Sequence, residues 1–154
     1  MSPRLVVLSG TILLLLVGSR MGAAQTISVS PASTGPLIIS SAVAGQEPTG
    51  VAGASGGTYT FSLKNNGGLR TITARLTAPL PPGTTLSIAL GSSGGGAVSA
   101  GSVQLTTSAQ PVVTNLPNSK VTNASSSITY SFSATSAAGV VALRSANVIL
   151  ALAP

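Results

Sequence analysis

Very few side chains of this sequence could act as acids, bases, nucleophiles or metal ligands. It contains no histidine and no cysteine, and Glu47 is its single acidic residue. A serine triad would therefore lack its base and its orienting acid, a glycosidase would lack its second carboxylate, and zinc or calcium would lack their usual ligands. A serine activated by Lys64 or Lys120 is the remaining route to catalysis, but neither lysine lies in a recognisable motif. We therefore expect no enzymatic activity, no metal and no cofactor.

The basic residues are too scattered to form a nucleic-acid-binding surface. The chain of 154 residues has seven Lys and Arg and a formal net charge of +6, but it has no cluster of neighbouring Lys and Arg that could follow a phosphate backbone. This charge implies at most a weak attraction to anionic polysaccharide or lipid headgroups. Asn123-Ala124-Ser125 fits the N-glycosylation pattern, which matters only in a eukaryotic secretory route.

The first 24 residues have the composition of a secretory signal peptide. Arg4 precedes an apolar run from Leu5 to Val17, and small residues follow at 22–24. The run is too short to cross the ~30 Å of hydrocarbon in a bilayer. We expect cleavage after Ala24 and one mature domain over residues 25–154, with no transmembrane segment. The expected location is extracellular, at the cell surface or in the periplasm, and without cysteine the domain can have no disulfides.

The clearest structural signal is the alternation of apolar and polar residues between Gly57 and Ala78. The apolar positions are Tyr59, Phe61 and Leu63 before the break Asn65-Asn66-Gly67-Gly68, and Ile72, Ala74 and Leu76 after it. A period of two is typical of a strand with one face in a core and one in water. Asn and Gly at the break tolerate the positive φ of tight turns. The pattern predicts a β-hairpin.

Short strands separated by turns are also expected along the rest of the mature chain. They fall at 25–30, 86–90, 102–106, 128–134 and 145–152. The stretch 110–117 is a strand or a turn, 36–40 is a second short run that could continue the first strand into the other sheet, and 140–143 follows a turn of small residues. The stretches 44–57 and 91–101 are rich in Gly, Ala and Ser and are expected to be loops. No segment of the mature chain shows a helical period. Seven or eight short strands in one domain predict an all-β fold, a single immunoglobulin-like antiparallel sandwich.

Four aromatic residues form two similar pairs, Tyr59 with Phe61 and Tyr130 with Phe132. In an immunoglobulin-like sandwich the second and sixth strands face each other across the core. We therefore expect the two pairs to meet, with Phe61 and Phe132 filling the centre. Tyr130 would then lie where a tyrosine corner places its residue, with its hydroxyl bonded to nearby backbone.

Two surface features could bind a partner. The first is a set of outward hydroxyls, namely Thr58, Thr60, Ser62, Thr71 and Thr73, although β-propensity and solvation also explain them. The second is the first strand, whose residues are Gln25, Thr26, Ile27, Ser28, Val29 and Ser30. It either pairs within its own domain or leaves it as a donor strand that completes a neighbouring sheet.

Two segments resemble recurrent parts of small secreted bacterial surface proteins of the fimbrial and biofilm-fibre type. They are Leu80-Pro81-Pro82-Gly83-Thr84-Thr85-Leu86, and the stretch from Ile128 to Thr135 followed by Ala138-Gly139-Val140-Val141. The similarity covers Thr58 to Leu150 and consists of strands and turns, so it carries over no catalytic residue. The cysteine pair of many chaperone-assembled pilins is absent.

The resemblance implies a structural or adhesive protein of the cell surface, whose partner is a second copy of the chain or a cell-surface polysaccharide. The alternative is an extracellular module that binds a ligand or glycan through the glycine-rich loops at one end of the sandwich.

Overall fold

A computed structural model describes residues 25–31, 37, 39, 50–64, 68–138 and 145–154 of the chain. The expected signal peptide, Glu47, most of the short run at 36–40 and the segment 140–143 lie outside these described residues. The described part has nine strands and one short 3-10 helix, η1 (Ser136–Ala138). The strands are β1 (Thr26–Ser30), β2 (Val51–Leu63), β3 (Arg70–Leu76), β4 (Thr84–Leu90), β5 (Val98–Ser99), β6 (Ser102–Gln104), β7 (Gln110–Leu116), β8 (Val121–Ala134) and β9 (Val148–Ala153).

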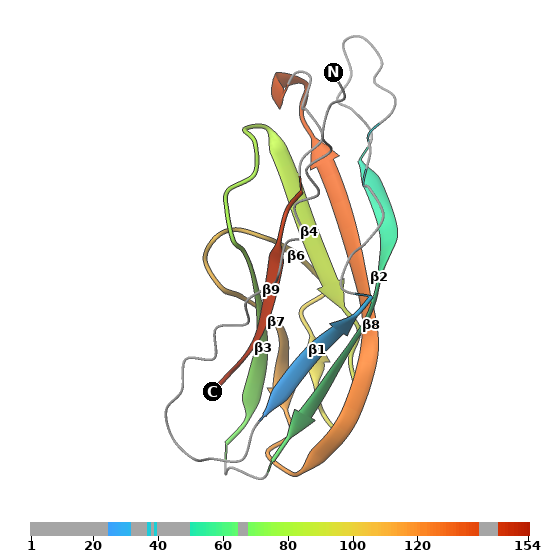
Figure 1. Cartoon of the computed structure of the whole chain (residues 1–154), viewed down its shortest axis with the longest axis vertical. Helices are drawn as coiled ribbons and strands as arrows, with labels where there is room; N and C mark the ends of the chain where they lie inside the picture. The colour runs from blue at the N-terminus through green and yellow to red at the C-terminus, as the bar shows by residue number, and fades with distance from the viewer. Residues whose placement is uncertain (1–24, 32–36, 38, 40–49, 65–67, 139–144) are drawn as a thin grey trace, which may run out of the picture.

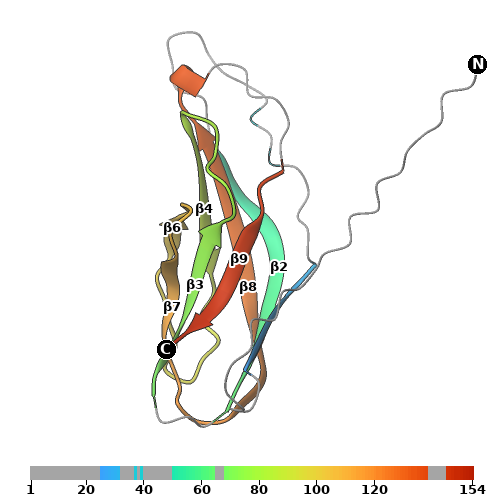
Figure 2. The same cartoon turned by 60° about the vertical axis from the view of Figure 1, so that its left-hand side comes forward.

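The strands form two antiparallel sheets, which confirms the all-β prediction and is consistent with a β-sandwich. The larger sheet, sheet A, has the order β1-β2-β8-β4-β6, and the smaller one, sheet B, has the order β5-β7-β3-β9. Figures 1 and 2 show the two layers along the long axis of the molecule. One cluster of buried side chains from both sheets fills the space between them.

The hairpin prediction for residues 57–78 is wrong. β2 belongs to sheet A, where it pairs with β1 and β8, whereas β3 belongs to sheet B, where it pairs with β7 and β9. Both strands do bury the expected side chains: Phe61 and Leu63 on β2 and Ile72 and Leu76 on β3 are fully buried. Alternation reports which face of a strand is apolar, and that face points inward in either sheet. The pattern is therefore the same for a hairpin and for a crossing between sheets.

The loop expected at 44–57 is also wrong where it is described, because β2 already begins at Val51. β2 and β8 are long strands of 13 and 14 residues that pair over most of their length, with several register shifts. One shift lies between Ser55 and Gly57, and Gly57 has φ of 86°. Such bulges let a strand of small residues follow its partner despite a poor intrinsic β-propensity. The stretch expected as a loop at 91–101 likewise contains the two-residue strand β5.

The two aromatic pairs do not meet across the core, because β2 and β8 are neighbours in the same sheet. Their register places Phe61 opposite Ala124 and Phe132 opposite Val51, so the pairs lie at different heights along the ladder. Tyr59 and Phe61 are buried and stack on each other, with ring centroids 6.0 Å apart. Phe132 is partly buried and packs against the edge of the core. The prediction that both phenylalanines share its centre is therefore wrong.

Tyr130 is also partly buried against the core, and its ring covers a glycine on the neighbouring strand. A side chain added at Gly56 would overlap the ring of Tyr130 and the side chain of Ile128. Glycine at this position leaves the space that an aromatic ring on the adjacent strand fills. A tyrosine hydroxyl does bind backbone in this core, but it belongs to Tyr59, which donates to the Gly91 carbonyl oxygen at 2.6 Å.

We expect Tyr59→Phe to lower the free energy of unfolding by about 1 kcal/mol, since the Gly91 carbonyl loses its donor. Burial raises the pKa of Tyr59 and of Tyr130. The folded state therefore favours the neutral phenols, and this stabilisation is complete below the unfolded pKa of about 10 and is lost as the pH rises above it. Urea unfolding between neutral and alkaline pH should show stability falling, less steeply in Tyr59→Phe. Equal slopes in the two proteins would contradict the burial of this hydroxyl.

Candidate functional site: the long sheet edges

The two lysines that were considered as activators of a serine nucleophile lie at the ends of strands. Lys64 follows β2 and Lys120 precedes β8, and both are exposed. Within the described ranges no group of three or more His, Cys, Asp or Glu residues could hold a metal ion. Both lysines thus extend into solvent from strand ends, as surface lysines commonly do.

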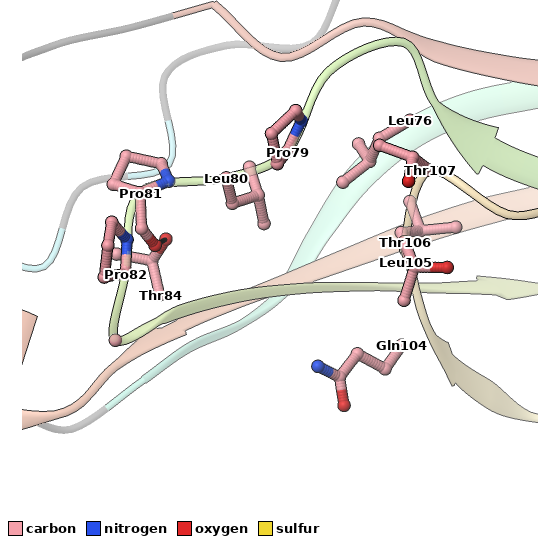
Figure 3. A pocket seen from close by; sticks show the side chains of 11 residues that line it. Leu76, Pro79, Leu80, Pro81, Pro82, Thr84, Gln104, Leu105, Thr106 and Thr107 are labelled. Atoms are coloured by element: carbon pink, nitrogen blue, oxygen red, sulfur yellow. Dashed lines mark hydrogen bonds between the residues drawn. The ribbon is translucent and has the colours of Figure 1, made fainter.

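A shallow hollow lies beside the proline-rich connection between β3 and β4 (Figure 3). It has a volume of about 320 Å³. In Figure 3, Pro79, Leu80 and Pro81 line one side, and Leu105 and Thr106 line the other. The lining contains hydroxyls, one amide and apolar groups but no charged side chain. The hollow therefore has no charged side chain that could pair with an ionic ligand.

The glycine-rich loop after β4 is held by its own hydrogen bonds. Gly94, Gly95 and Gly96 all have positive φ, and the Ser92 hydroxyl donates to the Ala97 carbonyl oxygen at 2.7 Å. The Ser126 hydroxyl of β8 donates to the Ser92 carbonyl oxygen at 3.1 Å. The first bond joins the two ends of the loop, and the second attaches the loop to β8. The Ser92 hydroxyl is thus used as a structural donor.

The expected hydroxyl surface is split between the two sheets. Thr58, Thr60 and Ser62 lie on β2 in sheet A, whereas Thr71 and Thr73 lie on β3 in sheet B. On sheet A the row continues sideways instead, because Thr60 lies opposite Ser28 of β1 and Ser125 of β8. This row of hydroxyls could not be predicted from the sequence, because it depends on pairing between strands that are far apart in the chain.

The four sheet edges differ sharply in length. On one side of the sandwich, β5 and β6 end the sheets with only two and three residues. On the other side, the edges are β1 with five residues and β9 with six. β1 and β9 approach each other there, as Figures 1 and 2 show. Very short strands are one way in which proteins protect their edges, and only the first side has this protection.

The residues of β9 themselves carry none of the side chains that usually protect an edge. Its sequence Val-Ile-Leu-Ala-Leu-Ala has no charge, glycine or proline, and Ile149 is 37% exposed on its outer face. The inward side chains Val148, Leu150 and Leu152 are only partly buried. On the neighbouring strand β3, the inward residues Ile72, Ala74 and Leu76 are at most 2% exposed. The core is thus closed under β3 and incompletely covered under β9.

The ladder of β9 with β3 determines which backbone groups of β9 remain free. The Thr77 N–H donates to the Asn147 carbonyl oxygen at 3.1 Å, and the register continues as Arg75 with Ile149. Because hydrogen-bonded and non-hydrogen-bonded pairs alternate in antiparallel sheets, Ile149 and Ala151 direct their N–H and C=O groups to β3. The corresponding groups of Val148, Leu150 and Leu152 point away from the sheet. Among the described residues, no strand pairs with this edge.

The expected donor segment pairs within its own chain in this structure. β1 lies antiparallel to β2, with Ile27 opposite Phe61 and Val29 opposite Tyr59. Ile27 and Val29 face the core but are only partly buried, whereas Thr26, Ser28 and Ser30 are exposed. The donor role of residues 25–30 remains a prediction that concerns exchange between copies. The sequence analysis did not single out β9 as an edge, although its six consecutive residues without charge, proline or glycine could have indicated one.

No family model, no curated protein and no solved structure matches this chain. A search of the described residues finds no helix that is long and apolar enough to cross a membrane. Function is therefore inferred from the residues and the geometry of the chain itself.

Proposed function

We propose that this chain is a non-catalytic structural or adhesive protein of the cell surface or extracellular space, which self-associates by β-strand addition. The observation that carries the proposal is the pair of long, uncharged edge strands, β1 and β9, on the same side of the two sheets. Unpaired N–H and C=O groups along an edge are a template for another strand. The resemblance to fimbrial and biofilm-fibre proteins and the signal-like N-terminus agree with this function.

As part of this proposal, the strands follow an immunoglobulin-like arrangement. In that fold one sheet has the order A-B-E-D and the other contains C, F and G. The order β1-β2-β8-β4 fits the first sheet, and β3 and β9 fit C and F. The place of strand G, beside β9, holds no strand among the described residues. A strand from another molecule would complete the sandwich there.

β1 is the element best suited to exchange between molecules. It pairs only with β2 in sheet A, and its two apolar side chains are only partly buried, so its release exposes little new apolar surface. The 20 residues from Pro31 to Gly50 connect it to β2, which is enough chain for β1 to leave while β2 stays in place. In an exchanged assembly, β1 of one copy would make the same contacts with β2 of the next copy, so the exchange would cost little free energy.

Light scattering after size-exclusion chromatography tests this function on the protein that begins at Gln25 and on a variant that lacks residues 25–30. We expect the longer protein to form assemblies that grow with concentration, and the shortened variant to form none beyond a small closed oligomer. A longer protein that stays monomeric at all concentrations would contradict self-association. If that monomer instead bound glycan saturably, a ligand-binding module would be the better reading.

A further inference from the structure

We propose that two copies of this chain pair through β9, antiparallel to each other about a two-fold axis at Leu150. This pairing would join the two copies of sheet B into one continuous sheet. The inference rests on the proposed function, self-association by strand addition, and names one pair of partners within it. Unlike donation of β1, it requires no strand to leave its place, because the β9 edge is already ordered and free among the described residues.

The backbone of β9 is complementary to a second copy of itself. The groups of Val148, Leu150 and Leu152 point to the free edge, as derived above from the register with β3. With the axis at Leu150, Val148 of each copy lies opposite Leu152 of the other, and the two Leu150 residues lie opposite each other. All three positions then form hydrogen-bonded pairs. An axis at Ala151 would instead place Val148 opposite Pro154, which has no N–H to donate.

The side chains of β9 fit the same register. On the outer face, Ile149 of each copy would lie opposite Ala151 of the other, a large residue against a small one. Ile149 is one of the few large apolar side chains that are exposed in the described part of the chain, and this contact would cover it. On the inner face, the partly buried Leu150 and Leu152 would gain apolar neighbours. The strand carries no charge to oppose the contact, and a closed two-fold pair is the commonest form of homo-oligomer.

The pairing also explains how a chain of molecules could grow. A β9 pair uses the edge of sheet B in each copy, whereas β1 lies at the edge of sheet A and takes no part in these hydrogen bonds. Exchange of β1 between such pairs would connect them through a second, different interface, and two different interfaces on one molecule give an open assembly. The β9 pair is the closed unit, and β1 exchange is the step that extends it.

Disulfide trapping tests the register directly, because the natural chain has no cysteine. Ile149→Cys and Ala151→Cys are made as separate single variants of the protein that begins at Gln25, and the two are mixed and oxidised. Directly opposite residues of a non-hydrogen-bonded pair have Cα atoms about 4.5 Å apart, which a disulfide can bridge. We expect the mixture to give a covalent dimer of both variants, in large excess over the dimers that each variant forms alone.

The matched control moves the same pair of cysteines one strand inward. Thr73→Cys and Arg75→Cys lie on the outer face of β3, directly opposite Ala151 and Ile149, but β3 has a neighbour on both sides. Their mixture should give no excess of mixed dimer. All four sites lie on the outer faces of their strands, so each variant is expected to fold. Thermal melts of the four reduced variants check this.

The outcomes separate this inference from the proposed function. If the mixed disulfide does not form, or if Ala151→Cys links to itself at least as well, pairing about Leu150 is wrong. If that result is found while deletion of residues 25–30 still abolishes assembly, strand donation stands and the β9 pair alone fails. A mixed disulfide in a protein that forms nothing larger than a dimer would support the β9 pair and contradict growth by β1 exchange. Deletion of residues 25–30 should leave the β9 dimer intact. If the deletion variant were a monomer, the β9 pair would be wrong.

Discussion

Phe61→Ala is expected to lower the free energy of unfolding by about 3–5 kcal/mol, the usual cost of removing a buried phenylalanine from a core. Phe61 is 1% exposed and stacks on Tyr59, which is fully buried. Both side chains lie at the centre of the cluster that joins sheets A and B. The truncation would therefore leave a cavity that the surrounding strands cannot easily fill. Urea denaturation monitored by circular dichroism measures the change.

Two further variants calibrate this result. Thr60→Ala changes the next residue on β2, whose side chain points away from the core, and its effect should stay within about 0.5 kcal/mol. Phe132→Ala should cost clearly less than Phe61→Ala, because Phe132 is only partly buried at the edge of the core. If the two phenylalanine variants were equally destabilised, the core would extend further towards the end of β8 than the structure shows.

The second large effect is expected for Gly57→Ala, which should destabilise the fold and loosen β1. Gly57 has φ of 86°, a left-handed conformation that costs most other residues about 1–2 kcal/mol. A methyl group there would also overlap the Ser30 carbonyl oxygen and the ring of Pro31. These atoms mark the end of β1, so the strand must shift away from β2. We expect a loss of at least about 1–2 kcal/mol from the backbone conformation alone.

Hydrogen exchange and assembly measurements show where the Gly57→Ala effect acts. The amides of β1 should lose protection more than those of β3, which lies in the other sheet. Gly68→Ala is the matched control, because nothing lies within 4 Å of a methyl group at that position. Its stability should be unchanged or slightly higher. Unchanged protection of β1 in Gly57→Ala would show that this glycine does not position the end of the strand.

If β1 exchange drives growth, Gly57→Ala should also reduce the large assemblies, because the exchanged strand would meet the same methyl group.

Local patterns predicted the faces of the strands well. The period of two identified Phe61, Leu63, Ile72 and Leu76 as inward residues, and all of them are buried. This succeeded because the side-chain direction in a strand is set by the backbone of that strand alone. The same reasoning failed at Val51, where small residues with poor β-propensity form the start of β2, since pairing with β8 stabilises a strand that local preference does not.

The candidate site shows the same division. The sequence alone predicted that the part of the chain that the structure describes is all-β, and it showed that the chain has no histidine, no cysteine and a single acidic residue. It also placed a short strand of alternating apolar and polar residues within 25–30. Only the tertiary structure decided that β2 and β3 lie in different sheets and that the aromatic pairs do not face each other. It also decided that β9 is an edge strand near β1, paired among the described residues with β3 alone. The physical reason is that pairing joins residues far apart in the chain, such as Thr73 with Ala151. Such a contact depends on the register and packing of both sheets together, and no local pattern contains it.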